Sequence, residues 1–212
     1  MKKISFNWAA WSEVCQIGIT KKGGTEIQFG AMTETVDIDQ GDKSIEEIVV
    51  VSGGRLVKKI PQEITKLTFE GYPIGIDAAT TPAKGISQWF HGQTTYDSTE
   101  PLTVVSTRIR EQFRVALLWT DDPAVTTSGG STATGKNAYR WSAFNAMLTS
   151  VKPSFTDGVL KFTFSFDVPA FNKQGTSQIA EESTEGTTGL SALSTYNTTN
   201  FPEDGAAFTY WA

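Results

Sequence analysis

One stretch of the chain, Val159–Phe171 (VLKFTFSFDVPAF), alternates apolar and polar side chains with a period of two. Successive side chains of an extended strand point to opposite faces, so the pattern predicts a strand with one apolar and one polar face. The preceding Asp157-Gly158 pair is a strong hairpin-turn signal. Pro169 cannot donate to a ladder, so the strand ends there or continues only at a sheet edge. The apolar face requires a second layer, and the polar face is a candidate functional surface.

The composition narrows the class of protein. With 212 residues, the chain is long enough for one substantial core. A net charge of −5 argues against binding of nucleic acid through a basic footprint. Cys15 is the only cysteine, so a disulfide framework and a thiolate metal cluster lack material. His91 is the only histidine, so an imidazole zinc site or a Ser-His-Asp triad within one copy would have no histidine beyond it. No signal peptide or membrane span is visible, so we expect a protein made in a cytoplasm, with no membrane partner.

Other stretches predict further strands. Ile17–Ile19 is followed by the turn-like Lys22–Gly24, which indicates a hairpin after an N-terminal arm. Ile45–Tyr72 has β-branched runs and reads as a long, partly irregular hairpin, preceded by a polar loop at Asp37–Lys43. Additional strands are expected at Leu102–Ile109, Phe113–Thr120 and Tyr139–Val151.

One short helix and a C-terminal arm complete the prediction. Pro82 fits the first position of a helix, and Ile86, Trp89 and Phe90 make one apolar stripe before Gly92. After residue 173 the chain becomes rich in Ser, Thr, Gly and Glu, which indicates an arm flexible in isolation. We therefore expect a mainly β protein: an antiparallel β-sandwich or barrel (1–173) with one short flanking helix, long hairpins and an extended C-terminal arm (174–212).

Three motifs have simpler explanations than catalysis or metal binding. Gly130–Lys136 matches the spacing of a phosphate-binding loop, but Asn137 stands where a hydroxyl should follow, so a surface loop is favoured. Asp37–Asp42 resembles a calcium loop without the closing glutamate, so a solvated turn is favoured. Exposed tryptophans can form sugar-stacking platforms, but tryptophans in β-sandwiches are more often core residues; the candidates are Trp8, Trp11, Trp119 and Trp141. We expect no enzyme activity, catalytic residue, cofactor or metal.

Several of these segments resemble the major tail tube proteins of tailed viruses. The resemblance rests on Thr35–Asp39, Gly53–Arg55, Ile64–Pro73, Tyr139–Ser154 and Asp157–Pro169, within about residues 35–180. Family members form hexameric rings that stack into a tube through which the genome passes. Their fold is a β-sandwich or barrel with one short helix, in agreement with the prediction from the residues.

The resemblance implies that long hairpins, here Ile45–Tyr72 and Phe144–Pro169, join edge to edge around the lumen. The candidate lumen-facing residues are Lys66, Thr68, Glu70, Lys161, Thr163, Ser165 and Asp167. The candidate inter-subunit residues are Gly53, Gly54, Arg55, Phe201, Phe208, Tyr210 and Trp211. This lining mixes charge signs, whereas an acidic lumen would repel DNA most cleanly.

The implied role is a self-assembling structural protein of a virion tail. Its partners would be other copies of itself, other tail proteins, and viral DNA passing through the lumen without specific binding. The alternative is a carbohydrate-binding β-sandwich of a virion or surface fibre, which requires two or more exposed aromatic residues on one face. An enzyme is a third possibility and rests on the phosphate-loop spacing alone.

Overall fold

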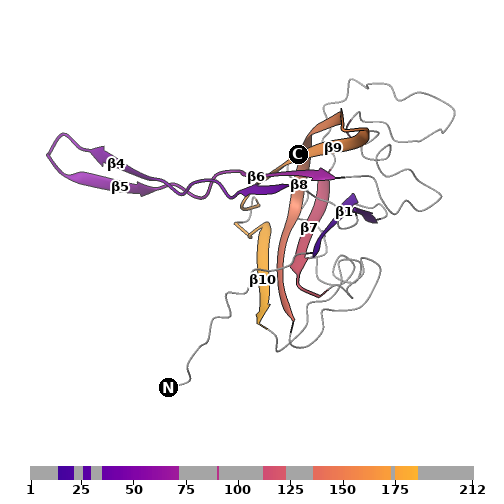
Figure 1. Cartoon of the computed structure of the whole chain (residues 1–212). Helices are drawn as coiled ribbons and strands as arrows, with labels where there is room; N and C mark the ends of the chain where they lie inside the picture. The colour runs from indigo at the N-terminus through magenta and orange to yellow at the C-terminus, as the bar shows by residue number, and fades with distance from the viewer. Residues whose placement is uncertain are drawn as a thin grey trace, which may run out of the picture.

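The computed structural model describes residues 14–21, 26–29, 35–71, 90, 112–122, 136–172 and 175–185. Apart from Phe90, which is helical, the regular secondary structure in these segments is strand, and the strands form one curled sheet with a projecting two-stranded ribbon (Figure 1). The strands are β1 (Val14–Lys21), β2 (Glu26–Phe29), β3 (Val36–Asp39), β4 (Ile45–Val49), β5 (Arg55–Lys59), β6 (Thr65–Gly71), β7 (Gln112–Thr120), β8 (Asn137–Thr156), β9 (Val159–Val168) and β10 (Ile179–Glu185).

The main sheet has eight strands in the order β2-β1-β7-β8-β9-β6-β3, with β10 paired to β8 beside that path. All of its pairs are antiparallel. The sheet curls into a half-barrel, which confirms the expected mainly antiparallel β class.

The strand β8 is the longest element and has different partners along its length. Its first half lies between β7 on one side and β10 on the other. Its second half pairs with β9, and a bulge between Leu148 and Ser150 marks the change. Asp157 (φ 53°) and Gly158 (φ 80°) close the β8–β9 turn in the left-handed conformation that Asp-Gly turns favour. The predicted hairpin is confirmed, and β9 ends at Val168, directly before Pro169.

A second long hairpin runs from β3 to β6. β3 pairs with β6 near the sheet, and β4 pairs with β5 in the ribbon. Between them, Ile60 N–H donates to Ser44 O (2.8 Å) and Glu63 N–H donates to Asp42 O (3.1 Å), so the two chains stay together through the irregular middle. The predicted irregular hairpin is confirmed, but it begins at Val36. The expected polar loop is wrong in part, since Val36–Asp39 is a strand.

The core lies where the alternating apolar residues of several strands meet. Phe69, Phe164 and Phe166 are at most 1% exposed, and their rings form the centre of the packing. The centroids of Phe69 and Phe166 are 6.1 Å apart with nearly parallel planes, and Phe113 meets Phe166 edge-on at 5.8 Å. The apolar face of Val159–Phe171 is therefore buried at Phe164, Phe166 and Val168, whereas Leu160, near the β8–β9 turn, is 45% exposed.

Two predicted features differ or fall outside the described residues. Part of the predicted C-terminal arm is the strand β10, whose backbone pairs with β8 from Asn137 to Ala143; the division of the chain at residue 173 remains a prediction. The predicted helix (82–92) and the predicted strand 102–109 lie outside the described residues, except for Phe90, which packs against the core.

Candidate assembly surfaces

The seven candidate lumen-facing residues share one face of the sheet. Their strands, β6 and β9, are neighbours in antiparallel register, and directly opposite residues of such a pair point to the same side. Lys66 is opposite Asp167, Thr68 is opposite Ser165, and Glu70 is opposite Thr163; Lys161 continues the same face toward the β8–β9 turn. Sequence periodicity thus identified a contiguous surface, which we call the polar face.

The polar face extends across two further strands. On β3, Asp37 lies opposite Thr68 and Asp39 lies opposite Lys66. On β8, Ser150 lies opposite Ser165 and Lys152 lies opposite Thr163. Four neighbouring strands, in the order β3-β6-β9-β8, therefore carry polar residues in continuous cross-strand rows.

These additional residues were missed from the sequence. Asp37 and Asp39 were assigned to a turn, although their alternation with Val36 and Ile38, both packed against the core, is the signal of a strand. Lys152 was overlooked because Pro153, beside it, interrupts the pattern of the strand.

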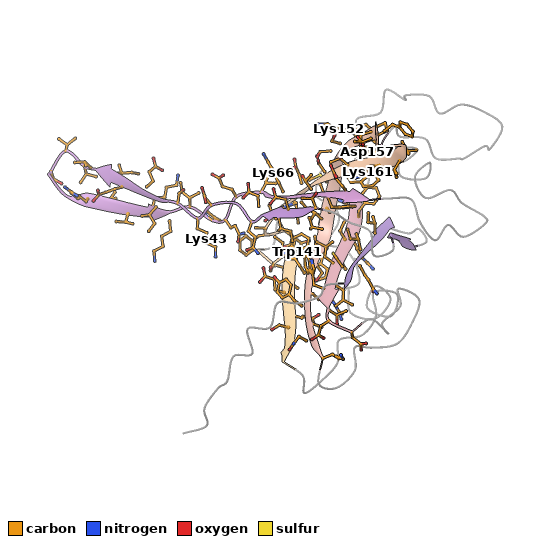
Figure 2. The ribbon with its side chains drawn as sticks, viewed as in Figure 1. Lys43, Lys66, Trp141, Lys152, Asp157 and Lys161 are labelled. Carbon is orange, nitrogen blue, oxygen red and sulfur yellow. The ribbon has the colours of Figure 1, made fainter. Side chains whose placement is uncertain are left out.

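The charges on the polar face are distributed unevenly. Asp37 and Asp39 give the β3 side two carboxylates. Lys152 and Lys161 give the β8–β9 hairpin two ammonium groups (Figure 2). In the middle, Lys66 lies in register between Asp39 and Asp167. The two edge strands of the polar face thus differ in the sign of their charges, with Asp37 and Asp39 on β3 and Lys152 on β8, while the strands between them carry both signs.

Both edges of this four-strand layer are open among the described strands. β3 stands at the end of the strand order and pairs only with β6. β8 loses β7 beyond Met147, so residues 149–156 have β9 on one side and no described strand on the other. Open strand edges present unpaired N–H and C=O groups to any suitable partner strand. Pro153 lies on the open part of β8, as expected for a proline in a strand, and offers no N–H there.

The β4–β5 ribbon carries apolar side chains on both of its faces. One face has Ile45, Val49 and Val57, and each of these is at least 60% exposed. The other has Ile48 directly opposite Leu56, also exposed. A ribbon of two strands has no interior of its own, so nothing within it buries these side chains.

Cross-strand ion pairs accompany the apolar residues of the ribbon. Arg55 Nη1 is 3.0 Å from Glu47 Oε1, and Lys58 Nζ is 3.5 Å from Glu46 Oε2. All four side chains are well exposed, so each pair contributes at most about 1 kcal/mol. They neutralise charge along the ribbon rather than hold it to the sheet.

The candidate inter-subunit residues Gly53, Gly54 and Arg55 form the end of the ribbon. Gly53 has φ 80°, a left-handed conformation, and its N–H donates to Val50 O at 2.8 Å. Val51 at this tip is fully exposed. The other four candidates, Phe201, Phe208, Tyr210 and Trp211, lie outside the described residues.

Hydrogen bonds fix the base of the ribbon to the sheet. Gln40 Nε2 donates to Glu181 Oε1 on β10, and the backbone oxygen of Gln40 accepts from Gln62 Nε2 and from Thr65 Oγ1. Tyr139 on β8 also interacts with Glu181. Burial first, and then the Glu181 carboxylate, raises the pKa of the Tyr139 phenol above its ordinary value. The base of the ribbon is thus held against β10 through Glu181, which also interacts with Tyr139 on β8.

The alternative sites receive little support from the described residues. Trp141 is completely buried, and Trp119 packs on Tyr139 with ring centroids 5.5 Å apart, so neither offers an open stacking platform. No group of three potential metal ligands occurs among the described residues, and none of their helices could cross a membrane. Most of the phosphate-loop match (130–135) and the tryptophans Trp8 and Trp11 lie outside the described residues.

No protein-family model and no curated protein matches the sequence. Among solved structures, the chain is similar to the tube-terminating cap of the anti-feeding prophage: TM-score 0.47 and 10% identity over 86% of this chain and 97% of that chain. It is similar to a chain of the anti-feeding prophage baseplate, with TM-score 0.46 and 8% identity over 84% and 97% of the two chains. It is also similar to the sheath/tube terminator of the extracellular contractile injection system PVC, with TM-score 0.42 and 13% identity over 84% and 99% of the two chains.

Proposed function

We propose that this chain is a structural subunit of a tail-like tube, or of a ring that ends or supports such a tube, and that it acts by self-assembly rather than by catalysis. Rings built from it, hexameric as the tail tube resemblance implies, would stack around a channel for a viral genome or another cargo. The exposed ribbon and the open edges of the sheet support this role.

The observation that carries the proposal is the exposure of the ribbon. Ile45 and Val49 are 70% and 69% exposed on one face, and Ile48 and Leu56 are exposed on the other. A single flat partner surface would cover only one face, so a partner arrangement that encloses the ribbon suits it best. Neighbouring copies of a ring, or of two stacked rings, provide such an enclosure.

The open edges support a ring in particular. A contact between two different edges, repeated by rotation, closes into a ring when the rotation permits. Among the described strands, the layer β3-β6-β9-β8 has one open edge at each side, so each copy can offer β3 to one neighbour and β8 to the other. Joined in this way, the layers make a closed barrel without exposed edges.

In such a barrel the polar face would line the channel, because the opposite face of the layer is the core. Lys66, Lys152 and Lys161 would then stand against Asp37, Asp39, Glu70 and Asp167. Acidic and basic groups nearly balance in this lining. Without a basic stripe, a passing nucleic acid would not be held by its phosphates.

The test is electron microscopy of the purified full chain across a concentration series, with mass determination in solution. We expect hollow rings or tubes of constant diameter. A chain that stays monomeric at every concentration tested would refute self-assembly and leave only the fold.

A further inference from the structure

We propose that the acidic β3 edge of one copy binds the basic β8 edge of the next, with Lys152 facing Asp37 or Asp39 across the boundary. This inference rests on the proposed function and specifies which surfaces meet, in which strand direction and through which charges. The partner is a second copy of this chain.

The direction of the strands allows β3 of one copy to pair with β8 of the next. Every neighbouring pair in the layer β3-β6-β9-β8 is antiparallel, so β3 and β8 run in opposite directions within one copy. Rotation about a ring axis preserves these directions. The β3 of the next copy therefore reaches β8 antiparallel, as every other strand pair of this sheet does.

The cross-strand register sets how far Lys152 on β8 lies from the rows of Asp37 and Asp39 on β3. The row of Asp37 passes through Thr68 and Ser165 and ends at Ser150 on β8. Lys152 ends the adjacent row, so it is one row from Asp37 and two rows from Asp39. Strands of a closed barrel are tilted, and the rows of neighbouring copies must meet with a shift. A shift of one row toward the β8–β9 turn sets Lys152 against Asp37, and a shift of two rows sets it against Asp39.

The charges of Lys152, Asp37 and Asp39 are available for a contact between copies. Lys152, Asp37 and Asp39 are all exposed, and no ion pair involves any of them within the part of the chain described. Lys66, by contrast, already has Asp39 and Asp167 as neighbours in its row. Asp39 is the less available of the two carboxylates, because its row contains Lys66 and its Oδ1 accepts a hydrogen bond from Gly41 N–H at 3.2 Å, so Asp37 is the better partner for Lys152.

Pro153 explains why side-chain charges would be needed at this boundary. A proline on the open part of β8 removes one donor from the ladder that a neighbour could form. A backbone ladder alone has a repetitive pattern and admits slipped registers, whereas an ion pair favours one register. Lys152, adjacent to Pro153, is well placed to select it.

Charge reversal tests the proposal. We expect Lys152→Glu, and separately Asp37→Lys or Asp39→Lys, to raise the protein concentration at half-maximal assembly about tenfold, because like charges would meet at each boundary. Combining Lys152→Glu with the correct aspartate reversal should restore assembly at the native net charge. The aspartate that restores it identifies the register. The effect of Lys152→Glu should shrink as salt is added, since the groups are exposed.

The matched control is Lys136→Glu, which makes the same charge change just before the other end of β8. Equal impairment by Lys136→Glu, absence of impairment by Lys152→Glu, or failure of both combined variants to assemble would overturn the pairing. If the unaltered chain forms no ring at all, the proposed function fails with it. If the Lys152→Glu variant forms rings at the same concentration as the unaltered chain, the pairing is refuted and the proposed function stands.

Cross-linking provides a measurement that does not depend on impaired assembly. In a Cys15→Ala background, a chain with Lys152→Cys is mixed with a chain carrying Asp37→Cys or Asp39→Cys and then oxidised. We expect a disulfide-linked dimer in the mixture for one aspartate position and little in either chain alone. An assembled mixture without such a dimer at either position would contradict the proposed boundary.

Discussion

Replacing the apolar pair Ile48 and Leu56 by threonine should weaken assembly without weakening the fold. The two side chains lie opposite each other on one face of the ribbon and are 43% and 59% exposed. Full burial of such a side chain contributes about 1.5–3 kcal/mol, so covering the exposed half of each contributes roughly 1 kcal/mol. The pair would then contribute about 2 kcal/mol to each contact that covers it. At about 1.4 kcal/mol per factor of ten, association through that contact weakens about 30-fold.

The assay measures two quantities on the same protein. Light scattering against concentration gives the midpoint of assembly, and urea denaturation of the dilute protein gives the free energy of unfolding. We expect the midpoint to rise by one to two orders of magnitude and the free energy of unfolding to change by less than about 0.5 kcal/mol, because the side chains already contact solvent.

Two controls separate the contact from the fold. The pair Ile48→Val and Leu56→Val keeps the surface apolar and should assemble nearly normally. Leu67→Thr changes a completely buried side chain and should lower the free energy of unfolding instead. The reasoning is refuted if the threonine pair assembles at an unchanged concentration. It is also refuted if that pair destabilises the dilute protein by more than 1 kcal/mol, since the ribbon would then be packed within its own subunit.

Three further predictions concern the fold. Phe166→Ala should lower the free energy of unfolding in urea by about 3–5 kcal/mol, because the Phe166 ring fills the core. Ser165→Ala, on the polar face, should lower it by less than about 1 kcal/mol. Similar losses of stability for both variants would argue against this core. Gly41→Ala should destabilise by more than about 2 kcal/mol, since φ is +67° and a Cβ would lie 3.0 Å from two backbone oxygens, while Gly158→Ala, left-handed but with open space, should cost about 1 kcal/mol. Stability should fall as pH rises above 10.0, because the unfolded Tyr139 phenol ionises there while the folded one, with its raised pKa, stays neutral. Denaturation of Tyr139→Phe should show a smaller loss above that pH, and an unchanged loss would assign the effect to other groups.

The polar face could be predicted from the sequence because one strong local signal was present. The alternation in β9 continues from Leu160 to Val168, and only an extended strand with a buried side explains it. The Asp157-Gly158 turn then set the β8–β9 register. The pairing of β6 with β9, which brings Lys66 next to Asp167, joins strands far apart in the sequence. The identities of the seven candidate lumen-facing residues do not reveal this pairing.

Other elements were missed because their signals are weak or their partners distant. β3 is only four residues long, and its aspartates favour a turn by composition; contact of Val36 and Ile38 with the core makes it a strand. β10, IAEESTE, has few apolar residues, and its strand form depends on backbone pairing with β8. The exposure of Ile48 on the ribbon was also unpredictable, because an apolar residue in a strand is normally taken as buried.

The continuity of β8 has a mechanical consequence. One strand, Asn137–Thr156, runs through the bulge at Leu148–Ser150 from the sheet core, where Trp141 is buried, to the open edge that carries Lys152. Tension applied at that edge along the strand would load many backbone hydrogen bonds to β7, β9 and β10 in shear at the same time, instead of opening them one after another. No flexible loop lies between the edge and the core to absorb the displacement. A subunit pulled or pushed at this edge should therefore move as a rigid block. In a ring of the proposed kind, stress on one subunit would pass to its neighbour with little damping.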